Sequence, residues 1–551
     1  MSYENEKDLE AQAQTDVAPV PKQHVHSSAV GILETDDGVP RTKGVFAPLW
    51  KAMSWFDRFG VEARGIERVP EDDRPHTSWW DNGTLWFSVN ACVGTFGVGY
   101  LGNLYWDMGL RDSALTIELG LRQMVLSRFS MGYWTGMIPV VFNLIACTGW
   151  ATMNTIAGVS CWQAISQTHQ IPTVAAVVIL ALLALIVSFC GYNVIHTYEK
   201  YAGFPVLICF IIAMGTSAKY MDLPGAWGGS GPVEAAGVLS FGCAIVGYAL
   251  GWVSFAADFT VSMPKETSTM KLFWVTFWGL AIPLIFIELM GALAVTTFAA
   301  RPDWEEMFND GAVGGLLAAL LEPCGGFGKF VLVILGLSTV AVDTPNVYIF
   351  TNTFHALSPY CQAIPRPFIA LLISIVYAAL AAAGADSFSA VLENLLLFLA
   401  YWLAIYIGIV VAEHLIFRKN SFDNYAPEDY KEWRKLPLGL AALVALGLGW
   451  CGAALDQHDS TPAWLSDPNS RALPIPSGEG MGPMVIGYIR GVLRAKRRSL
   501  TPPPGMSTSW FVGEIAQKIG GGGDVGFELA FVFAVVTFVP LRYLEKRWWG
   551  H

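Results

Sequence analysis

Long apolar runs recur along almost the whole chain and constrain its fold more than any other feature of the sequence. Roughly eleven runs of about 20 residues are long enough to cross a hydrocarbon core of about 30 Å as α-helices. They cover residues 83–104, 133–165, 172–192, 201–218, 233–260, 273–298, 327–351, 367–385, 387–417, 436–455 and 525–541. Backbone groups in lipid must be paired within a helix or a closed barrel, and the sequence lacks the short alternating strands of a barrel. The chain is therefore predicted to be an all-α membrane protein that crosses the bilayer many times.

Composition agrees with a membrane environment. Charged residues make up 14% of the chain, against roughly a quarter in an ordinary soluble domain. The nine cysteines show no CxxC spacing and lie mostly in apolar runs, so we expect neither a disulfide framework nor a metal site. The polar start of the chain has no apolar core after a basic segment, which argues against a cleavable signal. Residues 1–78 are predicted to form a disordered cytoplasmic tail.

Loop charges predict the orientation in the membrane. One set of loops and the C-terminus are basic, and the loops between them are acidic. The basic set contains Arg122, Arg128, Lys200, Lys265, Lys271, Arg366, Arg418, Lys419, Lys431, Arg434, Lys435, Arg542, Lys546 and Arg547. The acidic set contains Asp222, Glu234, Asp303, Glu305, Glu306 and Asp310. Because cytoplasmic loops are enriched in Lys and Arg, the basic set is predicted to face the cytoplasm.

Polar residues inside apolar spans are costly and mark candidate functional positions. The first span carries Ser88 and Asn90, followed by Gly94, Gly97 and Gly99. This pattern predicts a broken helix whose free carbonyl and amide groups bind a polar ligand, as in transporters built from repeats. The alternative is close helix packing through small residues.

Two tryptophans in other spans are candidates for stacking on a flat heteroaromatic ring. Trp150 and Asn154 are four residues apart and share one helix face. An indole stacks on a ring, while an amide offers both a donor and an acceptor. Trp252, which follows Gly251, is a candidate for the opposite face of the ligand. The alternative is a packed core tryptophan beside an asparagine with its hydrogen bonds satisfied.

The span 327–351 contains the strongest polar signal, in which Asp343 is followed by Pro345 and Asn346. Proline removes a backbone donor and predicts a kink. Placing a carboxyl group in lipid costs several kcal/mol, so its presence at this depth indicates a function. We therefore interpret Asp343 as the group that couples proton movement to ligand binding, and Pro345 and Asn346 as part of the ligand site.

Four motifs, in order, resemble the fungal form of the purine-cytosine permease branch of the nucleobase:cation symporters. They are 120–132 (GLRQMVLSRFSMG), 196–201 (HTYEKY), 251–260 (GWVSFAADFT) and 523–530 (GDVGFELA). The resemblance implies a LeuT-like bundle of two inverted five-helix repeats plus two C-terminal helices, working by alternating access. It also implies that the ligand contacts are Ser88, Asn90, Trp150, Asn154, Trp252, Pro345 and Asn346, with Asp343 beside them.

The chain departs from this family in three places. The family has a pattern close to Asn-Asn-x-Pro-Asn where this chain has Val342-Asp343-Thr344-Pro345-Asn346, which puts the identity of the base in doubt. The segment before Gly120 is too short for a complete second helix, so that helix is expected to be truncated. Residues 456–508 form a polar and basic insertion. We hypothesise that a lost exon and a retained intron account for the last two departures.

These observations predict a secondary transporter in the plasma membrane, with core 79–455, insertion 456–508, and last helix and tail 509–551. The expected cargo is a purine- or cytosine-type base or a related heteroaromatic solute, carried with a proton rather than sodium. The alternatives are a vitamin B6-type transporter of the same family, a non-transporting receptor, and an inactive product. An enzyme is not expected, because the spans contain no HExxH or GxSxG motif. We expect no cofactor, metal or nucleic-acid partner, and the sequence leaves the oligomeric state open.

Overall fold

The structure, a computed structural model, describes residues 47–56, 79–105, 124, 127–166, 168–190, 192–222, 231–254, 256–259, 268–385, 388–421, 424–426, 429, 432–454 and 524–550. Every regular element within these ranges is a helix. The spans are α4 (Trp79–Asn90), α5 (Val93–Tyr105), α8 (Met137–Gln163), α9 (Thr173–Phe189), α10 (Tyr192–Ser217), α11 (Pro232–Leu250), α12 (Thr269–Val295), α14 (Gly326–His355), α16 (Arg366–Gly384), α17 (Phe388–Ala412), α18 (Leu440–Ala454) and α21 (Gly526–Trp549).

Each of the predicted apolar runs coincides with one of these helices or with a pair of them. In the described part of the chain, 8 helices are long and apolar enough to cross a membrane, and α9 and α18 are shorter apolar helices. The all-α fold class is confirmed. The predicted second helix and the insertion 456–508 lie outside the described residues.

Two of the spans are interrupted. The first ends as α4 at Asn90 and resumes as α5 at Val93, with Ala91 and Cys92 in a bend. The other changes at Gly251 from α11 into the 3₁₀ turns η4 (Gly251–Ser254) and η5 (Ala256–Phe259). Both interruptions occur where the sequence places glycine or asparagine. The predicted break in the first span is confirmed.

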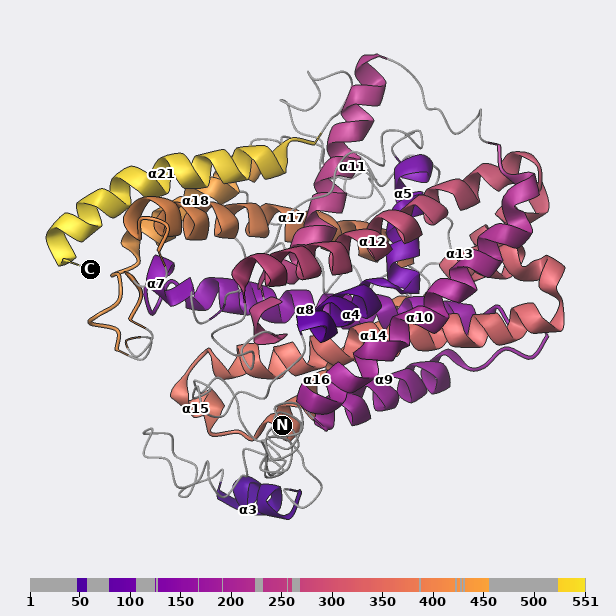
Figure 1. Cartoon of the computed structure of the whole chain (residues 1–551), viewed down its shortest axis with the longest axis horizontal. Helices are drawn as coiled ribbons and strands as arrows, with labels where there is room; N and C mark the ends of the chain where they lie inside the picture. The colour runs from indigo at the N-terminus through magenta and orange to yellow at the C-terminus, as the bar shows by residue number, and fades with distance from the viewer. Residues whose placement is uncertain are drawn as a thin grey trace, which may run out of the picture.

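Helix α4, the first half of the interrupted first span, lies at the centre of the bundle, while α11 projects from it at the top of the view (Figure 1). Helix α14 packs along α8 and also contacts α9, α10 and α16, while α12 packs against α4 and α5. The last two described helices, α18 and α21, pack together and against α17 at one side. The centre therefore brings together α4, α8, α10 and α14, which carry most of the predicted site residues.

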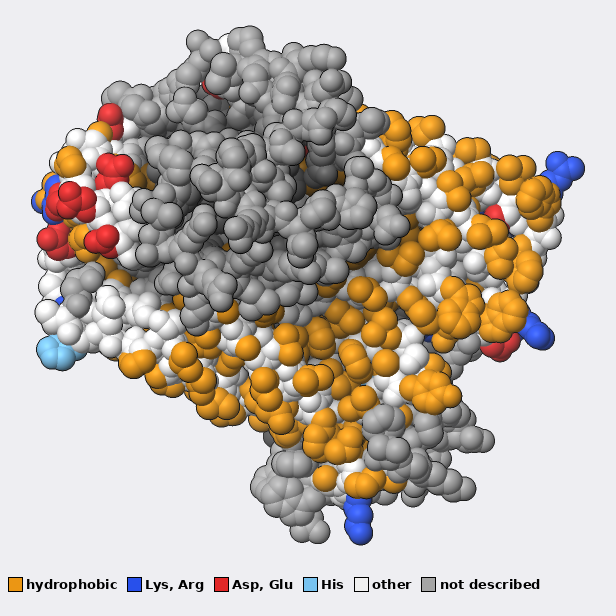
Figure 2. All heavy atoms as spheres, turned by 180° about the vertical axis from the view of Figure 1, so that it is seen from behind, with side chains coloured by type: hydrophobic (Ala, Val, Ile, Leu, Met, Phe, Trp, Pro, Cys, Tyr) orange, Lys and Arg blue, Asp and Glu red, His pale blue; other side chains and the backbone are white. Residues whose placement is uncertain are grey.

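The two ends of the bundle carry opposite charges. At the acidic end, exposed Asp303, Glu305, Glu306 and Asp310 gather together (Figure 2). At the basic end, which holds the C-terminus of α21, the exposed charges include Lys419, Lys546 and Arg547. Apolar side chains cover most of the described surface between the two ends in this view. This distribution is the one expected for a protein that spans a bilayer.

Two helices differ from the sequence predictions. Residues 302–321, which follow the predicted span 273–298 and contain the acidic run, form α13 (Pro302–Leu321), whose later part is buried from Val313 to Leu321. Residues 47–56, predicted to be disordered, form α3 (Ala47–Phe56), in which the Trp50 indole donates a 2.7 Å hydrogen bond to the Ala363 carbonyl. Both corrections have the same physical reason: a short amphipathic segment is ordered by a partner surface that local composition does not show.

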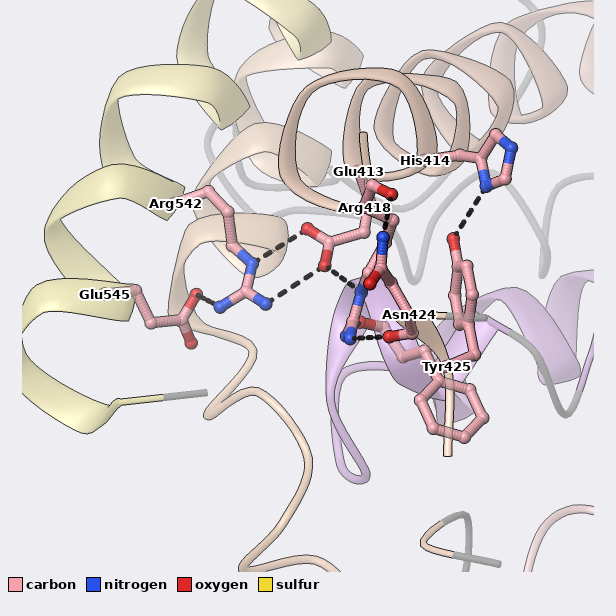
Figure 3. Close-up of polar contacts among 8 residues, drawn as sticks. Glu413, His414, Arg418, Asn424, Tyr425, Arg542 and Glu545 are labelled. Carbon is pink, nitrogen blue, oxygen red and sulfur yellow. Dashed lines mark hydrogen bonds and ion pairs between the residues drawn. The ribbon is translucent and has the colours of Figure 1, made fainter. Parts of the chain in front are cut away.

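A buried ion-pair network ties α21 to the end of α17 at the basic end (Figure 3). Arg542 Nε donates to Glu413 Oε2 at 2.9 Å, and Arg418 Nε donates to Glu413 Oε1 at 3.1 Å. The Glu545 carboxylate lies 3.8 Å from Arg542 and accepts a 2.5 Å hydrogen bond from the Gly439 N–H group. Buried charges need such partners, so this network fixes the last helix to the core.

Candidate functional site

The two interrupted helices are joined by a hydrogen bond between Trp252 and Asn90. Trp252 lies in η4, and its Nε1 donates to Asn90 Oδ1 at 2.9 Å. The Asn90 amide in turn donates to the Trp86 carbonyl at 2.8 Å, which fixes the orientation of the side chain. The Trp252 ring also meets Trp86 edge to face, with centroids 5.7 Å apart. Asn90, which was predicted from the helix break, therefore connects the two interrupted helices at the site.

A second chain of contacts leads from the break to Trp150. Thr95, in the first turns of α5, donates to the Asn90 carbonyl at 2.6 Å and lies 2.7 Å from the Tyr248 hydroxyl. The Tyr248 ring packs edge to face against Trp150, with centroids 5.1 Å apart. Trp150 also lies against Gly251, because a Cβ there would come within 3.3 Å of the indole nitrogen. Trp150 and Trp252 therefore flank the same turn.

The polar side chains of α8 and α14 meet at Asp343. Thr155 Oγ1 donates to Asp343 Oδ2 at 2.9 Å, and Asn154 lies near the same carboxyl group without a hydrogen bond to it. Asn346 lies one turn further along α14, where its Nδ2 donates to the Val342 carbonyl at 2.9 Å. That bond uses the amide nitrogen and leaves the Asn346 Oδ1 acceptor available to another group.

Three buried polar atoms in this group have no hydrogen-bond partner among the described residues. They are Asn154 Nδ2, Asp343 Oδ1 and Asn346 Oδ1. The side chains that carry them are at most 3% exposed. A buried polar group without a partner is costly, and one donor with two acceptors on two facing helices is a set that a polar ligand can satisfy.

Asn154 also connects this group to the helix break. A Cβ on Gly94 would lie 2.6 Å from Asn154 Oδ1, so only glycine leaves room for the amide there. The same interrupted segment, residues 90–95, is therefore the neighbour of both the polar side chains of α8 and α14 and the Trp252 ring of η4. Pro345 lies inside the continuous helix α14 and has no N–H to donate to the preceding turn.

Ser88 differs from the other predicted contacts. Its Oγ donates a short hydrogen bond to the Glu199 carbonyl and accepts one from the Gly203 N–H group at 2.8 Å. Both partners belong to α10, so the hydroxyl joins α4 to α10. The structure places it in helix packing and not among the unpaired groups.

Several residues of the site were not predicted from the sequence. Thr95, Thr155 and Tyr248 take part in the contacts above. Asn143 accepts from Ser254 Oγ at 2.7 Å and donates to Thr353 Oγ1 at 2.9 Å, so it links α8, η4 and α14. Their only sequence signal is a polar side chain inside an apolar span. No group of metal-ligating residues occurs in the described ranges.

Two interrupted helices that meet at a buried site of indoles and unpaired polar groups, in a bundle of membrane-spanning helices, define a secondary transporter of the LeuT-like class. Residues 111–453 match the family described as permeases for cytosine/purines, uracil, thiamine and allantoin, and the chain belongs to that family.

Characterised relatives extend the match to most of the chain. The purine-cytosine permease fcyB of Emericella nidulans is 36% identical over 509 residues, which are 89% of this chain and 90% of the relative. The purine-cytosine permease FCY2 of Saccharomyces cerevisiae is 32% identical over 529 residues, covering 90% and 89%. The vitamin B6 transporter TPN1 of the same yeast is 25% identical over 533 residues, again covering 90% and 89%. These relatives place the chain among transporters and not among enzymes, as predicted.

Solved structures show the same fold. The inward-facing conformation of Mhp1 superposes with a TM-score of 0.54 at 12% identity, covering 88% of this chain and 96% of Mhp1. The closed conformation of Mhp1, a nucleobase-cation-symport-1 family transporter with bromovinylhydantoin bound, gives 0.52 at 11% identity, covering 88% and 95%. The predicted LeuT-like bundle is thereby confirmed.

Proposed function

We propose that this protein carries a purine- or cytosine-type base, or a closely related heteroaromatic ring, across the plasma membrane together with a proton. The observation that carries the proposal is the set of unpaired polar atoms on Asn154, Asp343 and Asn346, buried within membrane-spanning helices near Trp150. A base supplies both a flat ring for the indole and donors and acceptors for the polar atoms. The relatives named as purine-cytosine permeases support the same cargo.

The ligand contacts in this proposal are Asn90, Trp150, Asn154, Trp252 and Asn346. Ser88 and Pro345 position the helices that carry these contacts. Ser88 holds α4 against α10, and Pro345 interrupts the hydrogen bonding of α14 because it has no N–H group. The basic end faces the cytoplasm, in accordance with the enrichment of Lys and Arg in cytoplasmic loops.

Asp343 carries the coupled proton in this proposal. One carboxyl oxygen is held by Thr155 and the other has no partner among the described residues. A carboxyl group that meets the ligand directly can change its protonation when the ligand binds, because the ligand supplies the missing hydrogen bond. This gives a physical link between proton binding and ligand binding.

The test is uptake of radiolabelled adenine, hypoxanthine and cytosine by cells that lack their own base transporters. We expect accumulation that a protonophore abolishes and that replacement of sodium by choline leaves unchanged. Asp343→Asn should abolish accumulation, while Glu288→Gln, a second buried carboxyl on α12, should not. Accumulation by Asp343→Asn with unchanged pH dependence would refute the role of this carboxyl, and ligand binding without flux in the wild-type protein would favour a receptor.

A vitamin B6-type solute is a second candidate, and the carboxyl group of Asp343 is the observation that favours it. A carboxylate accepts hydrogen bonds and also pairs with a cationic ring nitrogen. A competition panel of adenine, guanine, hypoxanthine, cytosine and pyridoxine against the labelled base decides between the two. Uptake of labelled pyridoxine that none of the bases reduces, with no uptake of the labelled bases, would assign the vitamin.

A further inference from the structure

Glu199 is a buried carboxyl group that the ligand site does not use. It lies on α10, in the HTYEKY motif 196–201, inside a membrane-spanning helix. The residue is 0% exposed, and neither carboxyl oxygen has a hydrogen-bond partner among the described residues. An unpaired carboxylate charge sealed from water is strongly disfavoured, so the group is expected to hold its proton in this conformation.

A tight contact between α4 and α10 lies at the backbone of Glu199. Ser88 on α4 bridges the Glu199 carbonyl and the Gly203 N–H group of α10. A Cβ on Gly203 would lie 2.8 Å from Ser88 Cα, so glycine is needed for the two helices to approach this closely. Ser88 is two residues before Asn90, and the α4–α10 contact beside Glu199 therefore adjoins the ligand site.

The residue after Glu199 is charged and partly exposed. The Lys200 side chain is 37% exposed and pairs with Asp81 of α4 at 2.7 Å. Tyr220, just after α10, meets Trp304 of α13 at the acidic end with ring centroids 5.1 Å apart, so Lys200 lies in the half of α10 farther from that end. Separation of α4 from α10 would break the Lys200–Asp81 pair and admit water from the basic end to Glu199.

The charged and titratable groups around Glu199 come from two helices. On α10 they are His196, Tyr198 and Lys200, and on α4 the group is Asp81. His196 packs edge to face against Phe259 of η5, with centroids 6.0 Å apart. No hydrogen bond from another described residue reaches the Glu199 carboxyl oxygens. Its protonation is thus governed by access of water and not by a fixed ion pair.

We propose that Glu199 is a proton-release group of the transport cycle: its carboxyl keeps a proton while α4 and α10 are in contact and gives it to water at the basic end when they separate. The O–H bond breaks, water takes the proton, and a hydrated carboxylate remains. When the contact closes again, a proton that the ligand site takes up with the next base restores the neutral carboxyl. This inference rests on the proposed proton symport and adds a second group to it, distinct from Asp343.

Glu199→Gln tests the proposal, with Glu288→Gln as the matched buried control. The assays use labelled adenine or cytosine, whichever the wild-type protein accumulates, in proteoliposomes that contain a pH-sensitive dye. Because Gln imitates the neutral carboxyl, we expect Glu199→Gln to fold and to exchange labelled for unlabelled base within about twofold of the wild-type rate. We expect its net accumulation and its base-driven proton flux to fall at least tenfold. Glu288→Gln should keep both activities.

Each other outcome has a definite meaning. Normal accumulation and proton flux in Glu199→Gln would overturn the role of Glu199 alone. Failure of Glu199→Gln to reach the membrane would also overturn it, because a group that is neutral in the folded state must tolerate a neutral isostere. Absence of base-driven proton flux in the wild-type protein would instead refute the proposed symport. Glu199→Asp, which retains a titratable group, should retain measurable net accumulation.

Discussion

The Trp252 indole nitrogen donates a 2.9 Å hydrogen bond to the Asn90 side-chain oxygen, across 162 residues of sequence. Each residue stands at the point where its own helix is interrupted. The bond therefore links the two interruptions directly, and a change in either one must be accompanied by a change in the other. In a transporter, this is a physical connection between the two helices that form the ligand site.

Trp252→Phe keeps an aromatic ring but removes the donor to Asn90. A buried acceptor left without its partner costs about 1–3 kcal/mol, so we expect the apparent KM for uptake to rise roughly tenfold. The concentration dependence of base uptake measures the effect. Trp134→Phe is the control, because Trp134 is 66% exposed. Equal KM values for the two variants would show that the bond does not support the site.

Gly94→Ala should reduce transport without unfolding the protein. The added methyl group would lie 2.6 Å from Asn154 Oδ1 and would push the amide out of its position. We expect base uptake to fall at least tenfold at unchanged membrane abundance. Gly215→Ala is the matched control, since a Cβ there has no neighbour within 4 Å. Normal uptake by Gly94→Ala would mean that Asn154 does not need this position for transport.

Arg542→Leu should destabilise the fold and not the ligand site. It leaves the fully buried Glu413 with Arg418 as its remaining ion-pair partner. Removing one partner of a buried ion pair typically costs about 3–5 kcal/mol. The thermal unfolding midpoint of the detergent-solubilised protein should fall clearly, whereas Arg547→Leu, at an exposed position of the same helix, should leave it unchanged. An unchanged midpoint for Arg542→Leu would show that the network contributes little.

Asp524→Ala should weaken the attachment of the last helix. Asp524 Oδ1 accepts from the Gly526 N–H group at 2.7 Å at the start of α21, and Oδ2 accepts from the Tyr401 hydroxyl at 2.6 Å. Loss of both bonds should lower stability by about 1–3 kcal/mol. The unfolding midpoint measures this, with the exposed Glu528→Ala as control. Equal midpoints would contradict a structural role for the 523–530 motif.

The membrane-spanning helices could be predicted because each run is long enough and apolar enough to be recognised alone. The polar positions could be predicted for the same reason, since Asn90, Trp150, Asp343 and Asn346 stand out inside apolar segments. Helix α13 was missed because its acidic first turns hide the apolar face that packs in the core. Helix α3 was missed because its order depends on Trp50 meeting the Ala363 carbonyl far along the chain.

The sequence by itself determined the spans, the interruption of the first span and the kinds of residue at the site, because a lipid solvent imposes length and polarity on each segment separately. Only the tertiary structure decided that Ser88 binds α10, that Thr155 reaches Asp343 across 188 residues, and that Glu199 is fully buried beside the α4–α10 contact. These pairings depend on the rotation and depth of each helix in the bundle. A helix that is apolar on all sides carries no periodic signal to specify either one.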